Sequence, residues 1–283
     1  MKKHAYLIIA HNNFYVLKKT LMLIDDERND IYIHIDKKVK NFDFVKYKNI
    51  CKKSTVHYTK KRYDVKWGES SQVKTEMLLF ETAYRTGYDY YHLISGSDMP
   101  IKSQNYIHNF FKNNRYEFIE LAPGEQEKYR FRLSRYHITS TKPILKRVSF
   151  YFDILQDKLK IDRLRKTNIK IYKGSNWASL SHKCVGFLLK NKYKIKKMTW
   201  LSLCADEVYK QTIILNSQFK ENVYPYEDIR LIDWDRYEGT SPHTFTVEDY
   251  EMIKNSKCLF ARKFIYEKDS EIIDKVFSMV KDA

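Results

Sequence analysis

The sequence contains few residues that break a chain or crosslink it. Its 283 residues include only seven Gly and five Pro, which argues against long flexible linkers. The four cysteines form neither a CxxC pair nor a metal-ligand spacing: Cys51, Cys184, Cys204 and Cys258. This spacing argues against a disulfide scaffold and a zinc module, and it predicts reduced thiols in a cytoplasmic protein.

Long hydrophobic runs are also missing. No stretch approaches the roughly 20 apolar residues that span a bilayer. The apolar run near the start, residues 5–10, ends at His11 and has no cleavage site, so we expect no secretory signal. The resulting expectation is a cytoplasmic protein. Hydrophobic residues still make up 43% of the chain and charged residues 31%, so the chain should fold around a core.

Positive charge is abundant. Lys and Arg number 52 against 35 Asp and Glu, a formal net charge of +17. Such a surface attracts nucleotides, nucleic acid, acidic glycans or the anionic inner face of a membrane. A genome-wide bias toward Lys codons would produce the same excess. A nucleic-acid-binding protein is one alternative, but the sequence has no RNA-recognition, helix-turn-helix or zinc-finger pattern, so we expect no specific nucleic acid partner.

The first 36 residues predict a βαβ unit. A continuous apolar strand at 5–10 precedes a helix that Asn12 or Asn13 caps and that runs to about Ile24. The next strand, 31–35, ends at Asp36. Ligands of such units sit at the carboxyl ends of the strands, where Asp36 can bind a ribose or simply close a turn. His11 and Asn12 lie at the end of the first strand. The sequence has no GxGxxG, which disfavours a common dinucleotide fold.

Further elements alternate along the chain and favour one mixed α/β domain over residues 1–283. We expect strands at 90–94, 116–121 and 177–180, and an irregular or edge element at 126–138. We expect helices at 71–85, from Ser181 to about 191, and from 205 or 206 to 215, a basic partly helical stretch at 142–170, and an amphipathic tail at 269–280.

Several segments in order along residues 5–265 resemble one known family. They read AYLIIAHNN, IYIHIDKK, VKWGESSQV, YYHLISGSDMPIKS, YKGSNWASLSHKCVGFLL, ADEVYKQTIILNS, IDWDR and CLFARKF. This ordered set resembles the core-2/I-branching β-1,6-N-acetylglucosaminyltransferase family, which also includes peptide xylosyltransferases.

The resemblance implies a GT-A type fold, with a Rossmann-like mixed sheet flanked by helices. Its nucleotide-binding part would cover about residues 1–100 and its acceptor and catalytic part about 101–283. The resemblance also implies inverting transfer of a sugar from a UDP-sugar to a glycan hydroxyl. GlcNAc is the expected sugar, and the alternatives are xylose or a hexose other than GlcNAc. It implies no divalent metal and no cofactor. The sequence has no DxD in mid-chain, and Asp233-Trp234-Asp235 lies too late to be the family's metal position.

An inverting transfer needs a base for the acceptor hydroxyl and positive charge for the leaving diphosphate. By resemblance the base is Glu207 of the Ala205-Asp206-Glu207 segment, with Asp206 as a cap; alternatively, both acids only complement a helix N-terminus. Lys263 matches the lysine that binds the diphosphate. His243 stands where the family has an arginine, and Arg262 or Arg236 could compensate for that difference.

The expected acceptor side has four candidates. Trp177 could stack on a sugar ring or simply be buried. Arg130 and Arg132 belong to an arginine and aromatic strip that could face the acceptor or form an exposed charged strand. Asp98, in the turn Ser95-Gly96-Ser97-Asp98, could contact a ligand or only shape the turn.

Overall fold

The fold is built on two β-sheets with helices packed around them. A computed structural model describes residues 3–138, 143–226, 228–239 and 241–283, without the side chains of 143–146. The larger sheet has six strands, in the spatial order β3 (Thr55–Tyr58), β2 (Asn29–Ile35), β1 (His4–Ala10), β4 (Tyr90–Ser95), β7 (Ala178–Ser181) and β6 (Phe118–Ile119). The smaller sheet has the order β5 (Asp98–Pro100), β9 (Phe260–Arg262) and β8 (Arg230–Ile232).

Strand direction divides the larger sheet into two parts. Strands β1, β2, β3 and β4 are parallel, whereas β7 runs antiparallel to both β4 and β6. The carboxyl ends of β1, β2 and β4 therefore meet at one edge of the sheet. The predicted Rossmann-like mixed sheet flanked by helices is confirmed.

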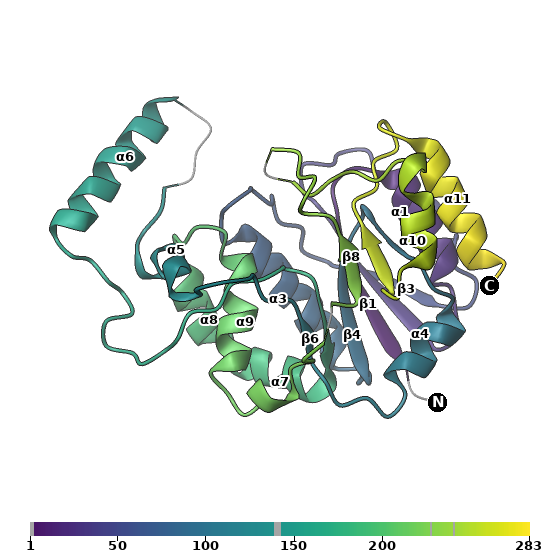
Figure 1. Ribbon diagram of the computed structural model, residues 1–283, viewed down its shortest axis with the longest axis horizontal. Helices are drawn as coiled ribbons and strands as arrows, with labels where there is room; N and C mark the ends of the chain where they lie inside the picture. The colour runs from purple at the N-terminus through teal and green to yellow at the C-terminus, as the bar shows by residue number, and fades with distance from the viewer. Residues whose placement is uncertain (1–2, 139–142, 227, 240) are drawn as a thin grey trace.

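Helices cover both faces of this sheet (Figure 1). The α-helices are α1 (Phe14–Leu23), α2 (Phe44–Lys48), α3 (Ser71–Tyr84), α4 (Gln104–Phe111), α5 (Phe131–Ser134), α6 (Pro143–Lys158), α7 (His182–Lys190), α8 (Lys192–Thr199), α9 (Tyr209–Leu215), α10 (Tyr250–Asn255) and α11 (Ser270–Lys281). Four 3-10 turns complete the order: η1 (Glu127–Tyr129), η2 (Ala205–Glu207), η3 (Lys220–Asn222) and η4 (Val247–Asp249). None of the helices in the described residues is long and apolar enough to cross a membrane.

Successive side chains of β1 point to opposite faces of the larger sheet, which explains why helices cover both faces. Ala5, Leu7 and Ile9 point into one core, with α3, α7, α8 and α9, while Tyr6 and Ile8 point into a second core, with α1 and α4. Every residue of β1 is buried, as its unbroken apolar run predicts. A third core joins α1, α10 and α11 to the smaller sheet. Figure 1 shows these helices on the side of the molecule opposite to α7, α8 and α9.

Most expected elements occur, and three local predictions need correction. The segment 126–138 follows its irregular alternative: it contains the turn η1 and the short helix α5, so its arginines do not lie on an edge strand. Asn13, one of the two predicted positions, is the N-cap residue of α1, but its side chain makes no capping bond, because its amide donates to Ser97 Oγ at 2.8 Å instead. Asp206 does not cap a helix either, because it lies inside η2, whose N-cap residue is Cys204. The predicted cap at Ser181 is confirmed: its Oγ accepts from the Cys184 amide at 3.2 Å.

Candidate active site

A cleft of about 690 Å³ opens at the sheet edge where β1, β2 and β4 end. Its wall also includes the segment before α3, the loop after β6, the turn η2 and the residues that follow β8. Of the residues expected to act, the lining includes His11, Asp36, Trp177, Glu207, Arg262 and Lys263. Segments far apart in sequence therefore bring most of the expected site together.

Glu207 faces the cleft from η2 and is held by two cations. Arg132 Nη1 donates to its Oε2 at 2.7 Å, and Lys173 Nζ lies 3.4 Å from the same oxygen. The backbone of Glu207 is also fixed, because its carbonyl accepts from the Gly174 amide at 2.8 Å. The carboxylate is thus oriented by positive charge on a short helical turn, and about a third of the side chain remains exposed (31%).

Asp206 lies next to Glu207 above a buried ion pair. Lys210 donates to both the Glu76 carboxylate and the Asp206 carbonyl, and the side chains of Lys210 and Glu76 are fully buried. Burial, reinforced by the negative charges of Glu76 and Glu207, raises the pKa of Asp206 to about 7. Two adjacent carboxyls on the cleft therefore sit in different environments.

Another acid of the cleft, Glu120, follows β6 directly and is not among the residues predicted from the sequence. Glu120 lines the cleft, and its buried Oε2 has no hydrogen-bond partner among the described residues. Burial, with the nearby charge of Asp228, raises the pKa of Glu120 to about 7. Its position directly after a strand is the sequence signal that could have identified it. Lys173 was also missed, although it lies within a segment that carried the family resemblance.

The positive charge of the opposite wall comes from the end of β9. Arg262 Nη1 donates to Asp98 Oδ1 at 2.7 Å and to Ser95 Oγ at 2.5 Å. Its guanidinium carbon also lies 4.8 Å from the centre of the Trp177 ring. Lys263 follows on the cleft, and burial together with Arg262 lowers its pKa. A half-buried lysine and a fixed arginine thus create a positive site for an anion.

Asp36 and His11 line the same cleft at the ends of β2 and β1. The Asp36 carboxylate accepts from the backbone amides of Lys38 at 2.8 Å and Val65 at 3.1 Å. Asp36 therefore closes a turn, one of its two expected roles, and still reaches the cleft. Burial lowers the pKa of His11, against the charge of Asp36. The neutral imidazole can donate or accept a hydrogen bond there.

Four of the expected site residues do not line the cleft. Asp98 is buried and binds Ser95 and Arg262, so it shapes the turn and holds Arg262 and is not part of the cleft lining. Arg130 pairs with Asp162 at 3.1 Å and with Glu127, away from the cleft wall. Arg132 reaches the site only through its contact with Glu207.

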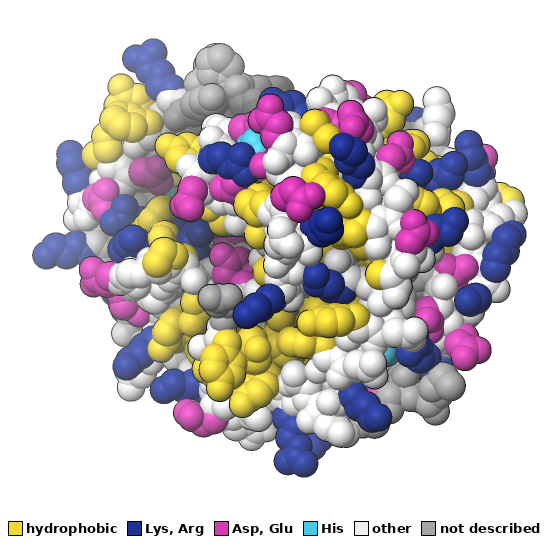
Figure 2. Space-filling view, turned by 45° about the vertical axis from the view of Figure 1, so that its right-hand side comes forward, with side chains coloured by type: hydrophobic (Ala, Val, Ile, Leu, Met, Phe, Trp, Pro, Cys, Tyr) yellow, Lys and Arg dark blue, Asp and Glu magenta, His cyan; other side chains and the backbone are white. Residues whose placement is uncertain are grey.

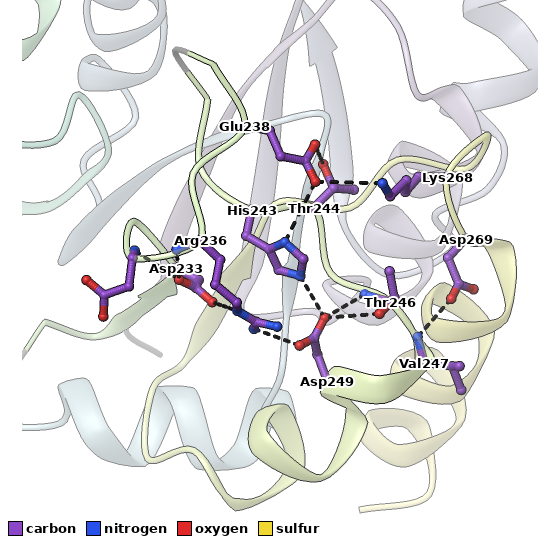
Figure 3. Close-up of polar contacts among 11 residues, drawn as sticks. Asp233, Arg236, Glu238, His243, Thr244, Thr246, Val247, Asp249, Lys268 and Asp269 are labelled. Atoms are coloured by element: carbon purple, nitrogen blue, oxygen red, sulfur yellow. Dashed lines mark hydrogen bonds and ion pairs between the residues drawn. The ribbon is translucent and has the colours of Figure 1, made fainter.

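His243 is the fourth of these residues (Figure 3). Its Nε2 lies 3.0 Å from Asp249 Oδ2, and its Nδ1 lies 3.7 Å from Glu238. Arg236 is tied to Asp233 and Asp249, so it does not compensate for His243 at the cleft. These contacts fasten the loop after β8, whose Trp234 and Pro242 reach the cleft. In the Asp233-Trp234-Asp235 pattern, the Asp233 carboxylate belongs to this network, because it accepts hydrogen bonds from Arg236.

The described residues contain no group of three or more His, Cys, Asp or Glu side chains arranged to hold a metal ion. All four cysteines are reduced thiols, and Cys204 lines the cleft. Cys51, Cys184 and Cys204 are buried, and burial raises the pKa of Cys204 to about 11.

The cleft and the mixed sheet can be set beside known proteins. The chain matches the sequence model of the Core-2/I-Branching enzyme family over residues 4–256, and it belongs to this family. The curated relatives include beta-glucuronosyltransferase GlcAT14B of Arabidopsis thaliana, which is 25% identical over 294 residues. Xylosyltransferase sqv-6 of Caenorhabditis briggsae is 25% identical over 278 residues. These alignments cover 97% and 86% of this chain but only 65% and 32% of the relatives, so the chain spans part of their length.

The solved structures that align with this chain are more distant in sequence. The bifunctional glycosyltransferase WbbM, in its apo form, aligns with all of this chain and half of its own, at 11% identity and a TM-score of 0.47. A putative glucose-1-phosphate thymidylyltransferase from Bacillus anthracis, in complex with sucrose, aligns with 80% of this chain and 86% of its own, at 16% identity and a TM-score of 0.38. Likeness at this level says nothing about the reaction.

Proposed function

We propose that the protein is an inverting glycosyltransferase that moves a sugar from a UDP-sugar to a glycan hydroxyl. The observation that carries this proposal is the composition of one cleft. A fixed carboxylate, Glu207, and two cations, Arg262 and Lys263, line the same space at the carboxyl end of a parallel sheet. Family membership and the names of both relatives support the reaction class.

The chemistry assigns one task to each wall. The acceptor oxygen attacks the anomeric carbon while the bond from that carbon to the UDP oxygen breaks, which inverts the configuration. Glu207 takes the proton that the acceptor hydroxyl loses. Lys263 and Arg262 stabilise the negative charge that develops on the leaving diphosphate. The resident contacts of Arg262 hold its guanidinium in place before any ligand arrives.

We also propose that the transfer needs no divalent metal. Two cationic side chains can supply the charge that a metal ion supplies elsewhere. His11 and Asp36, at the ends of β1 and β2, are placed to contact the nucleoside. Trp177 lines the cleft, and the Arg262 guanidinium lies over its ring.

The donor sugar in this proposal is GlcNAc, and xylose or glucuronic acid are the alternatives that the names of the relatives add. A panel of UDP-sugars should be tested for hydrolysis and for transfer to oligosaccharides, with excess EDTA present. Turnover of one UDP-sugar that gives product of inverted anomeric configuration supports the proposal. Binding of no uridine nucleotide at all would refute it. Activity that EDTA abolishes and Mn²⁺ restores would refute only the metal independence.

A further inference from the structure

Helix α6 stands away from the rest of the molecule (Figure 1). It projects on the side opposite α10 and α11, and none of its described side chains belongs to the three hydrophobic cores. Gln156 attaches the helix to the body: it is buried and exchanges two hydrogen bonds of 2.8 Å with the backbone of Tyr136. An ion pair between Asp157 and Arg135 adds to this attachment.

The outward surface of α6 is apolar. Phe150, Tyr151 and Leu155 are 61%, 57% and 50% exposed, and Val148 and Ile154 are also exposed. These residues are three or four positions apart or adjacent, so they form one continuous patch over two helical turns. Five exposed apolar side chains together, on a helix that packs little against the rest of the protein, indicate a surface that binds a partner.

Basic and acidic side chains lie on different sides of α6. Arg147 directly precedes Val148, and Lys158 lies about one turn after Leu155; both are exposed on the outward side. The acidic side chains turn toward the body, where Asp157 pairs with Arg135 and Asp153 lies within reach of Gln156. Figure 2 shows hydrophobic side chains at the upper left of the molecule with Lys and Arg beside them.

The segment after α6 continues this positive charge. Its exposed basic residues are Lys160, Arg165, Lys166 and Lys170. Its acid, Asp162, is neutralised by Arg130 at 3.1 Å. An apolar helix face flanked by exposed cations matches the interface of an anionic bilayer, in which aromatic and aliphatic side chains enter the headgroup boundary and cations meet lipid phosphates.

We propose that α6 docks the protein onto an anionic phospholipid surface. The apolar patch enters the interface, while Arg147, Lys158 and the cations that follow α6 bind lipid headgroups. A short stretch of chain joins α6 to α5, whose Arg132 contacts Glu207. Docking through α6 would therefore keep the cleft close to the membrane, where membrane-bound acceptors are concentrated.

Vesicle co-sedimentation tests this proposal without any assay of activity. Wild-type protein should bind vesicles of phosphatidylcholine mixed with phosphatidylglycerol, and the double substitution Phe150→Glu with Leu155→Glu should lower the affinity at least about tenfold. The matched control is Val45→Glu with Tyr193→Glu, which adds the same charge at two exposed apolar positions of α2 and α8. This control should bind like the wild type. Thermal unfolding should show that both double variants are folded.

Two further measurements can overturn the proposal. Arg147→Glu with Lys158→Glu should remove most of the preference for phosphatidylglycerol over pure phosphatidylcholine vesicles, and an unchanged preference would refute the electrostatic part. Sedimentation of the wild type in solution tests for a second copy as the occupant. A dimer that the Phe150→Glu, Leu155→Glu variant breaks, together with no vesicle binding by the wild type, would overturn the assignment. Equal vesicle binding by that variant and the wild type would also overturn it.

Discussion

Replacement of Glu207 by Gln is the most direct test of the proposed chemistry. Gln keeps the size of the side chain, and its amide oxygen can still accept the hydrogen bond that Arg132 Nη1 gives at 2.7 Å. The substitution removes the basic oxygen and the negative charge that Lys173 faces at 3.4 Å. The fold around η2 should survive, since the carbonyl of residue 207 still binds Gly174.

The magnitude follows from the role assigned to the carboxylate. A positioned general base contributes about 10² to 10⁴ in rate, which corresponds to roughly 3 to 5 kcal/mol of barrier. Glu207→Gln should therefore lower the transfer rate at least about 100-fold. UDP affinity should stay close to that of the wild type, because Lys263 and Arg262 belong to the opposite wall. The ion pair with Arg132 is partly exposed, so its loss should cost about 1 kcal/mol of stability or less.

The assay is transfer under single-turnover conditions, with UDP calorimetry and thermal unfolding on the same samples. Asp206→Asn is the matched control, since it changes the neighbouring carboxyl to the amide and should reduce the rate less. If Glu207→Gln retained more than about a tenth of the transfer rate, the base would have to be another group. Glu120 would then be the next carboxyl to replace, because it lines the same cleft.

Three other predictions test the remaining parts of the site. Lys263→Ala should weaken UDP binding at least several-fold, because a charge-assisted hydrogen bond contributes about 1.5 to 3 kcal/mol. The control Lys254→Ala, on the exposed side of α10, should bind UDP like the wild type. Unchanged UDP binding by Lys263→Ala would show that Lys263 does not contact the diphosphate. The pKa of Asp206 is about 7 in the folded protein, whereas the ordinary pKa of an aspartate is 3.8. Between these two values the folded protein keeps a proton that the unfolded chain releases, so the free energy of unfolding falls as the pH rises from 4 to 7. Asp206→Asn should therefore gain thermal stability relative to the wild type between pH 5 and pH 8, and a constant difference would contradict the assigned burial. Gly174→Ala should lower the stability by about 1 to 3 kcal/mol, because its Cβ would lie 1.7 Å from the carbonyl oxygen of Glu120, and an unchanged melting temperature would show that this approach is looser.

Sequence reasoning was most accurate where one physical signal dominates. The apolar runs of β1, β2 and β4 could be recognised because strands buried on both faces have no polar alternation. Short elements such as β5, β8 and β9 were missed, because three residues carry no period. For the arginine strip at 130–135 the edge-strand alternative was wrong: the strip lies in short helical turns, from which Arg130 contacts Asp162 and Arg132 contacts Glu207.

The site divides in a similar way. Glu207 and Lys263 could be placed on the cleft by their motifs, and the structure brings both there. The place of His243 could not be predicted, because it depends on Asp249 and Glu238, which are fixed by the path of the loop after β8. Glu120 was missed because its significance comes from burial beside Asp228, which lies on a distant segment of the chain.

The cations near the cleft differ from the cations beside α6 in the side chains that they contact. Those of the cleft are oriented by specific acceptors: Arg262 by Asp98 and Ser95, and Arg132 by Glu207. Such fixed charges can stabilise a developing anion without reorganising during the reaction. The exposed cations beside α6 lie next to an apolar patch and are free to follow a fluid surface. The net charge of +17 alone therefore identifies no ligand. The partners of each cation separate the fixed Arg262, which we propose to act on a diphosphate, from the exposed cations beside α6, which we propose to bind lipid.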